Sequence, residues 1–235
     1  QGNPAVEVSE TVGTITASQG TNQIQIVRGM IGRGVELRTP AINRVGNSTV
    51  QLVHNGSQLG TDERLLITGA TPTVTNGMVA PWMISASDTQ FLTYNGNTGY
   101  TIAGFDRAQS GATLASTVTA TANRTIFTGS VVLNTGVDFE TYALRLDGNV
   151  TQGTVTDTTA QVIVGSGGLI SNGTRTITTG IVAGSVGTPA ELLLYNNGTT
   201  TIGAFASPDT SGQILATGIT KFDAVNLQSI DNKEG

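Results

Sequence analysis

Residues 160–170 have the sequence AQVIVGSGGLI, and residues 190–202 have the related sequence AELLLYNNGTTTI. Each stretch contains an apolar strand candidate, a corner rich in Gly or Asn, and a second strand candidate. A strand–corner–strand unit cannot bury its apolar face alone and gains stability by stacking on copies of itself. The pair therefore predicts an all-β chain folded as a parallel β-helix. The alternative is a β-sandwich whose hairpins have similar turns.

Short apolar segments of this kind recur along the chain between Gly and Asn residues. No helix-length apolar period lies between them, so parallel pairing of these segments requires stacked turns of chain rather than helical crossovers. The expected strands contain residues 24–26, 35–37, 50–52, 65–67, 144–146, 162–164 and 192–194. Alternation along the strands predicts that the core contains Leu144, Leu146, Val162, Val164, Leu192 and Leu194.

The composition agrees with an ordered, strand-rich protein. Of 235 residues, 31 are Gly, 37% are hydrophobic and 11% are charged, at a net charge of −5. Gly and the abundant Thr are poor helix formers, and this hydrophobic content at low net charge opposes disorder.

The Lys and Arg residues are scattered singly and the pI is near 4.7, so we expect no nucleic-acid partner. No apolar run approaches the length of a membrane span, so we expect no membrane insertion.

Three blocks in the first half of the chain carry a resemblance to a known family. Residues 76–82 (NGMVAPW), 88–94 (DTQFLTY) and 99–105 (GYTIAGF) resemble a block of autotransporter-associated β-strand repeat proteins of bacterial surfaces. Residues 141–203 are similar to the glycine-rich rungs that follow this block in the family. The resemblance implies a secreted right-handed β-helix, the fold of autotransporter passengers, that serves as a surface stalk, adhesin or matrix component.

This reading predicts three parts of the chain. Residues 1–34 are an N-terminal strand that caps the β-helix or joins subunits, and residues 206–235 are a C-terminal strand or cap. Residues 35–205 are the β-helix, with an aromatic-rich insertion near residues 78–107. A chain that begins at Gln1 and contains few charges fits an exported protein from which a signal was removed, so we expect an extracellular location at the bacterial cell surface.

Residues suited to catalysis are few. The chain has no Cys, which removes disulfides, thiolate nucleophiles and thiolate metal ligands. His54 is the only His, so a Ser-His-Asp arrangement must use it, and the ordinary interpretation is a turn after a strand. The acidic candidates are the pairs Asp138 with Glu140 and Asp62 with Glu63, and Asp106 beside Arg107. The favoured interpretation is that they are solvated groups near turns. We therefore expect a non-enzymatic protein, and the alternative is a carbohydrate-active β-helix enzyme.

Two binding hypotheses remain at the level of sequence. Calcium prefers oxygen ligands, and no cofactor other than calcium is expected; its candidate ligands are Asp62, Glu63, Asp147 and Asn149.

Five aromatic residues lie between Trp82 and Phe105 in a chain with few others. They form either a small aromatic core, which is the favoured interpretation, or a platform for surface glycans or a partner. The candidate platform residues are Trp82, Tyr94 and Tyr100.

The last expectation is self-association. The ends of a β-helix expose unpaired backbone groups and a slice of apolar core, so they must be capped or joined to another subunit. The opening stretch alternates like a strand, and it either folds back as a cap or pairs with the exposed edge of a neighbour. We favour the neighbour, which gives a head-to-tail filament. The expected subunit contacts are Val6, Val8, Val12 and Ile15.

Overall fold

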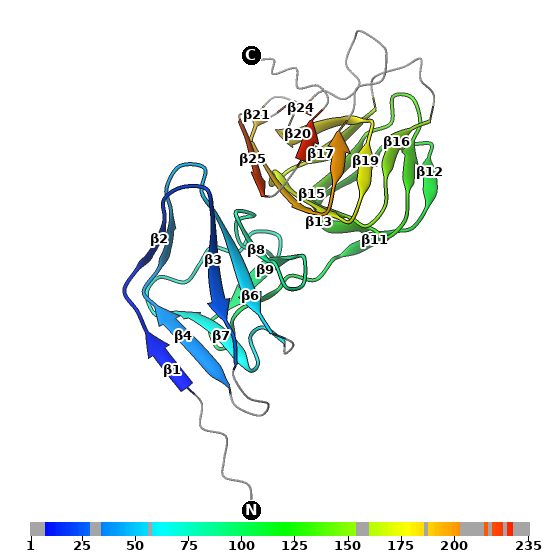
Figure 1. Cartoon of the computed structure of the whole chain (residues 1–235). Helices are drawn as coiled ribbons and strands as arrows, with labels where there is room; N and C mark the ends of the chain where they lie inside the picture. The colour runs from blue at the N-terminus through cyan, green and yellow to red at the C-terminus, as the bar shows by residue number, and fades with distance from the viewer. Residues whose placement is uncertain are drawn as a thin grey trace, which may run out of the picture. The chain divides into compact units, whose positions relative to one another are not determined.

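The computed structural model describes residues 8–28, 34–55, 58–153, 160–185, 188–202, 214–215, 218–222 and 225–227. These residues form strands, turns and bends and contain no helix, so the all-β prediction is confirmed (Figure 1). The chain divides into two compact units, Gln1–Ala103 and Gly104–Gly235. The division falls inside the stretch 35–205 that the sequence suggested to be one β-helix. All seven expected strand segments lie in strands.

The first unit is built mainly from parallel strands. Its ladders have the orders β1-β4-β7, β2-β5 and β3-β6-β8. Along the first ladder and between β3 and β6, a residue pairs with one 27 or 28 positions later, as Val8 does with Val35 and Thr21 with Thr49. The step from β6 to β8 is longer. The strands are β1 (Val8–Thr11), β2 (Ile15–Ala17), β3 (Thr21–Ile26), β4 (Val35–Thr39), β5 (Ile42–Arg44), β6 (Thr49–His54), β7 (Glu63–Ile67), β8 (Met83–Ser85), β9 (Gln90–Asn95) and β10 (Gly99–Ile102).

The described strands among the first 34 residues are therefore part of this unit's sheets, because β1, β2 and β3 pair with β4, β5 and β6. At the other side of the third ladder, β8, β9 and β10 pair in antiparallel fashion. The apolar side chains that alternate along these strands meet in one core. It includes Ile26, Val50, Leu52, Leu65, Met83, Leu92, Tyr94 and Tyr100.

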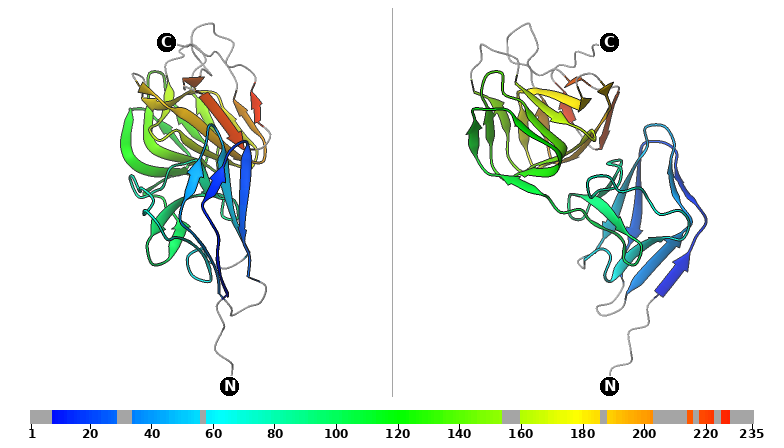
Figure 2. Two further views of the ribbon diagram at one scale, coloured as in Figure 1. Left: turned by 90° about the vertical axis from the view of Figure 1, so that its left-hand side faces the viewer. Right: turned by 180° about the vertical axis from the view of Figure 1, so that it is seen from behind.

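Parallel ladders also dominate the second unit (Figure 2). One ladder has the order β12-β14-β16-β19-β23-β26, and the larger sheet centres on β15. The strands are β11 (Arg107–Gln109), β12 (Ala112–Leu114), β13 (Val118–Phe127), β14 (Val131–Leu133), β15 (Phe139–Leu146), β16 (Val150–Gln152), β17 (Gln161–Val164), β18 (Gly168–Asn172), β19 (Arg175–Ile177), β20 (Gly180–Ser185), β21 (Thr188–Pro189), β22 (Glu191–Asn197), β23 (Thr200–Ile202), β24 (Ile214–Leu215), β25 (Gly218–Phe222) and β26 (Val225–Leu227).

The core of the second unit agrees with the alternation in the sequence. All six predicted core residues are at most 2% exposed, and they pack with Phe127 and Phe139, whose rings meet edge to face at 4.8 Å. Leu193, on the opposite face of β22, is also buried, at 5% exposure. The strand is therefore covered on both faces at this point, which sequence alternation alone does not indicate.

The two related stretches at 160–170 and 190–202 are not equivalent in the structure. Residues 161–164 pair with β20, whereas residues 193–197 of β22 pair with β18. The eight-residue strand β15 pairs with β17 over its first half and with β18 over its second half. The chain between β17 and β18 turns at Gly167, whose φ is +74°. Because of the extra residues in this corner, the two similar stretches do not pair with each other at equivalent positions.

Candidate functional site

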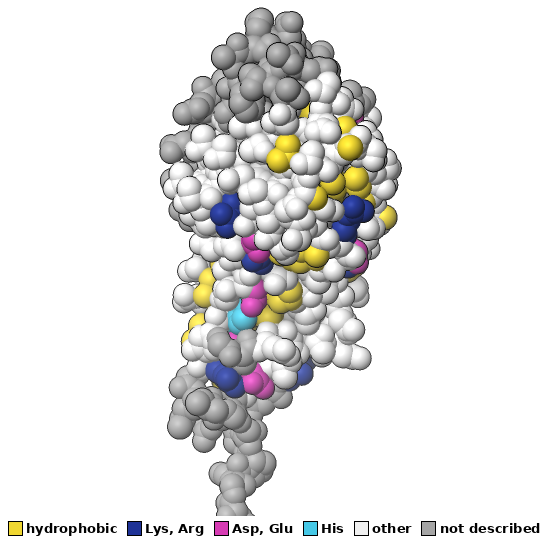
Figure 3. All heavy atoms as spheres, turned by 90° about the vertical axis from the view of Figure 1, so that its right-hand side faces the viewer, with side chains coloured by type: hydrophobic (Ala, Val, Ile, Leu, Met, Phe, Trp, Pro, Cys, Tyr) yellow, Lys and Arg dark blue, Asp and Glu magenta, His cyan; other side chains and the backbone are white. Residues whose placement is uncertain are grey.

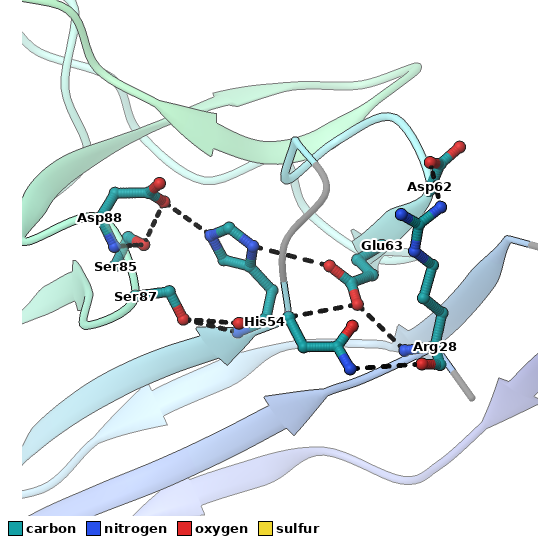
Figure 4. Close-up of polar contacts among 8 residues, drawn as sticks. Arg28, His54, Asp62, Glu63, Ser85, Ser87 and Asp88 are labelled. Carbon is teal, nitrogen blue, oxygen red and sulfur yellow. Dashed lines mark hydrogen bonds and ion pairs between the residues drawn. The ribbon is translucent and has the colours of Figure 1, made fainter. Parts of the chain in front are cut away.

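The strongest cluster of interacting ionisable side chains surrounds His54, the last residue of β6. The strand alternates, so Val50, Leu52 and His54 share one face, and all three are buried. His54 is 8% exposed. A buried imidazole needs polar partners, and the structure supplies a carboxylate on each side of the ring (Figure 4).

The first carboxylate belongs to Asp88, in the turn between β8 and β9. Its Oδ2 lies 2.6 Å from His54 Nε2 and accepts a hydrogen bond of 2.6 Å from Ser85 Oγ. The Asp88 amide donates to the same Ser85 hydroxyl, at 3.2 Å. Ser87 Oγ accepts from the His54 amide at 2.9 Å and donates to the His54 carbonyl at 2.7 Å. The turn is thus attached to both the backbone and the ring of His54.

The second carboxylate belongs to Glu63, at the start of β7, and its side chain is completely buried. Glu63 Oε2 lies 3.5 Å from His54 Nδ1, and Oε1 accepts from the amides of Arg28 at 3.0 Å and Asn55 at 3.3 Å. The Arg28 guanidinium pairs with Asp62 at 2.7 Å. Glu63 therefore joins the end of β3, the end of β6 and the start of β7.

A cavity of about 680 Å³ lies beside this cluster. Its walls include His54, Asp88 and Ser87, together with Thr61, Thr98 and Thr101. In the space-filling view of one face, the histidine (cyan) reaches the surface beside acidic side chains (magenta) (Figure 3).

The geometry does not form a Ser-His-Asp triad within the described residues. A triad requires the nucleophilic hydroxyl to hydrogen-bond to a ring nitrogen. Here Ser85 Oγ bonds to Asp88, and Ser87 Oγ bonds to the main chain of His54. Both ring nitrogens instead face carboxylate oxygens.

The other candidate acids have different surroundings. Asp106 pairs with Arg124 rather than with its neighbour Arg107, through contacts of 2.7 and 3.0 Å and a main-chain bond of 2.9 Å. The hydrogen bond from the Arg124 side chain holds the pKa of Asp106 below its usual value. Glu140 lines a cavity of about 610 Å³, whereas Asp138 accepts from the amide of Gln161 at 3.1 Å. Among the described lining residues of that cavity, Glu140 is the only carboxylate.

The four candidate calcium ligands each contact other protein groups. Asp62 and Glu63 lie in the first unit, where Asp62 pairs with Arg28. Asp147 in the second unit accepts from Arg145 at 2.9 and 3.1 Å. Asn149 Oδ1 accepts from the amide of Thr176 at 3.0 Å. Across the part of the chain that the structure describes, no group of three or more His, Asp or Glu side chains is placed to hold a metal ion.

The aromatic residues of the candidate platform lie mostly in the interior. Tyr94 and Tyr100 are 8% and 3% exposed, and their rings meet edge to face at 5.0 Å. Tyr94 Oη accepts from the amide of Ile67 at 2.9 Å. Burial, with a smaller contribution from Tyr94, raises the pKa of Tyr100 well above its usual value. Trp82 is half-buried and lines an apolar cavity of about 350 Å³ with Tyr100. The two tyrosine rings therefore offer no stacking surface, and Trp82 alone retains some exposure.

The expected subunit contacts lie along the edge of the first unit. Val8 and Val12 are 52% and 39% exposed, and Ile15 is half-buried where β2 pairs with β5. Val6 lies outside the described residues. Within the described residues, β1, β2 and β3 each pair on one side.

Comparison with family models, with curated proteins and with solved structures finds no match to this chain. The described residues include no helix of the length and apolarity that crossing a membrane requires.

The contribution of Glu63 and Asp88 to the His54 cluster was not predicted from the sequence. The available signal was the alternation Val50, Leu52, His54, which places the only histidine on the buried face of its strand. The partners themselves are 9 and 34 residues further along the chain, and only the pairing of strands brings them to the ring.

Proposed function

We propose that this chain is a non-enzymatic structural protein, a β-helix building block that associates head to tail with copies of itself into a filament, stalk or matrix at a bacterial surface. The observation that carries the proposal is the arrangement of the open strand edges. At the beginning of the first unit, β1, β2 and β3 each have a described neighbour on one side. At the last described strands of the second unit, the same holds for β24, β25 and β26.

The parallel ladders favour the β-helix over the sandwich, since sandwiches are built from antiparallel strands. In the first unit the chain visits three ladders in turn and then returns to the first, 27 or 28 residues later. In the second unit the corresponding step is 19 residues from β12 to β14 and 25 from β18 to β22, and it varies among the other strand pairs. A right-handed coil is the hand that parallel crossovers adopt.

Strand polarity makes another copy of this chain the suitable occupant of the open edges. Each edge strand runs parallel to its one described neighbour, so stacking the last strands of one copy on the first strands of the next continues the ladders in the same sense. Such a contact is heterologous and extends without closing unless rotation forms a ring. Val8 and Val12 are exposed beside this edge, and they lose water when a neighbour pairs there.

The carbohydrate-active alternative has weaker support from geometry. Glycosidases work with two carboxylates at a defined separation. The cavity at Glu140 has one described carboxylate in its walls, and the carboxylates at His54 are paired with that ring. The extracellular location, the adhesive role and any contact with glycans rest on composition and on the family resemblance.

Light scattering of the purified full chain over a range of concentrations tests the proposal. We expect the mean particle mass to rise with concentration. A variant with Val8→Lys and Val12→Lys adds charge at the edge and should stay smaller, because edge lysines oppose strand addition. The matched control is Val45→Lys with Val74→Lys, since these valines are also exposed, at 51% and 40%.

The control should associate as the unmodified chain does. A chain that stays monomeric at the highest concentration refutes the proposal. Equal association of the edge variant and the control shows that the contact lies elsewhere and refutes the assigned edge.

A further inference from the structure

We propose that His54 is a titratable clamp. With both ring nitrogens protonated, it holds the β8–β9 turn and the start of β7 against the end of β6, and loss of one proton releases one of these contacts. The proposal is independent of self-association.

The geometry of the ring is the first argument. Nε2 faces Asp88 Oδ2 at 2.6 Å, and Nδ1 faces Glu63 Oε2 at 3.5 Å. A neutral imidazole has one N–H and one lone pair, so it can donate to only one carboxylate. Its lone pair would then point toward the other carboxylate oxygen. Nε2 is within hydrogen-bond distance of Asp88, whereas the Nδ1 contact to Glu63 is an ion-pair distance without a hydrogen bond. The closed arrangement therefore matches the imidazolium, which donates to Asp88 and turns a charged N–H toward Glu63.

The surrounding charges support the same protonation state. The described acidic groups that face the ring are Asp88 from the β8–β9 turn and Glu63 from β7. Arg28, after β3, approaches through its amide, and its guanidinium pairs with Asp62. The imidazolium is thus the cation placed between these two carboxylates.

The carboxylates are held in place by other donors. Asp88 accepts from the Ser85 hydroxyl, and Glu63 accepts from the amides of Arg28 and Asn55. The two carboxylates are thus fixed by groups other than the imidazole, and the ring lies between them.

The clamp acts on a wall of a cavity. Asp88 and Ser87, from the β8–β9 turn, line the cavity of about 680 Å³, as does His54 itself. When the imidazole loses a proton, the contact to one carboxylate becomes repulsive and that segment loosens. The sign follows from linkage. The closed form binds the proton, so closure is favoured at lower pH and weakens as the pH rises through the titration of His54.

The presence of a single histidine makes the test direct. We would follow the imidazole nitrogen and proton resonances of the full chain by NMR as the pH is raised, together with amide hydrogen exchange of Ser85 and Asp88. We expect two ring N–H signals at low pH. We expect loss of one signal as the pH rises, accompanied by faster exchange of these amides by about tenfold.

Variants separate the clamp from a passive buried histidine. Asp88→Asn and Glu63→Gln each remove one negative partner, so each should move the imidazole titration to lower pH. Asp106→Asn is the control, because that carboxylate pairs with Arg124 in the other unit. It should leave the titration unchanged. If Glu63→Gln does not fold, Asp88→Asn alone decides.

Two results would overturn the proposal. One is a ring that carries a single N–H at every pH at which the chain is folded. The other is amide exchange in the β8–β9 turn that does not follow the titration of the imidazole.

Discussion

Replacement of Gly167 by Ala should destabilise the second unit by about 2–3 kcal/mol. Gly167 has φ +74°, and a Cβ placed there would lie 2.0 Å from the carbonyl oxygen of Glu191 on the neighbouring strand. A left-handed conformation costs an L-residue about 1–2 kcal/mol. Relief of the clash moves the corner away from β22 and weakens the 2.8 Å bond from the Leu193 amide to the Gly167 carbonyl, a further loss of about 0.5–1.5 kcal/mol.

Gly165 is the matched control in the same corner. A Cβ there would meet the nearest atom, the carbonyl oxygen of Thr141, at 3.6 Å, an ordinary contact. Gly165→Ala should therefore change the free energy of unfolding by less than about 1 kcal/mol, because it also restricts the unfolded chain. Urea unfolding followed by hydrogen exchange of the β18 and β22 amides measures both variants. Equal stability of the two variants would refute the stacking of this corner on β22.

Three further predictions concern single side chains. Leu194→Ala should lower the free energy of unfolding in urea by about 2–5 kcal/mol. Leu193 is also buried, at 5% exposure, so Leu193→Ala should lower it by a similar amount and by more than a substitution at the surface would. The lowered pKa of Asp106 stabilises the fold above the ordinary aspartate pKa, and this contribution is lost as the pH falls through the folded-state value. Asp106→Asn should thus cost stability at neutral pH, by a small amount because the carboxylate is 39% exposed, and nothing in strong acid. Burial raises the pKa of Tyr100, so stability should fall as the pH rises above the ordinary tyrosine pKa, and Tyr100→Phe should reduce that alkaline loss measured by circular dichroism.

Strands and core positions could be predicted because their signal is local. Period-two alternation places Leu192 and Leu194 on one face, and both are fully buried. The same rule places Leu193 on the other face, but it cannot say whether that face is covered. Coverage depends on which segments pack there, and that is a property of the tertiary structure.

The register of strand pairing and the boundary between the two units could not be predicted from local sequence patterns. The similarity between residues 160–170 and 190–202 suggested equivalent positions, yet β17 pairs with β20 and β18 pairs with β22. The corner at Gly167 changes the number of residues between successive strands. The strand sequences are similar to one another, so they do not specify which strand pairs with which. The division after Ala103 likewise reflects which strands pair.

Of the candidate site, the sequence could indicate only one member. His54 is the sole histidine and lies on the buried face of an alternating strand, so its need for a polar partner could be predicted. Asp88 could not be identified as that partner, because it lies in a turn of common composition 34 residues later. Glu63 was considered as a calcium ligand, and in the structure it faces the imidazole instead.

Electron microscopy of the full chain at high concentration is the best test of end-to-end stacking through the open strand edges. We expect unbranched filaments one molecule wide, whose diffraction shows the strand spacing of about 4.7–4.9 Å along the filament axis. We also expect the variant with Val8→Lys and Val12→Lys to form short particles under the same conditions. Single particles of the unmodified chain at all concentrations would contradict end-to-end stacking.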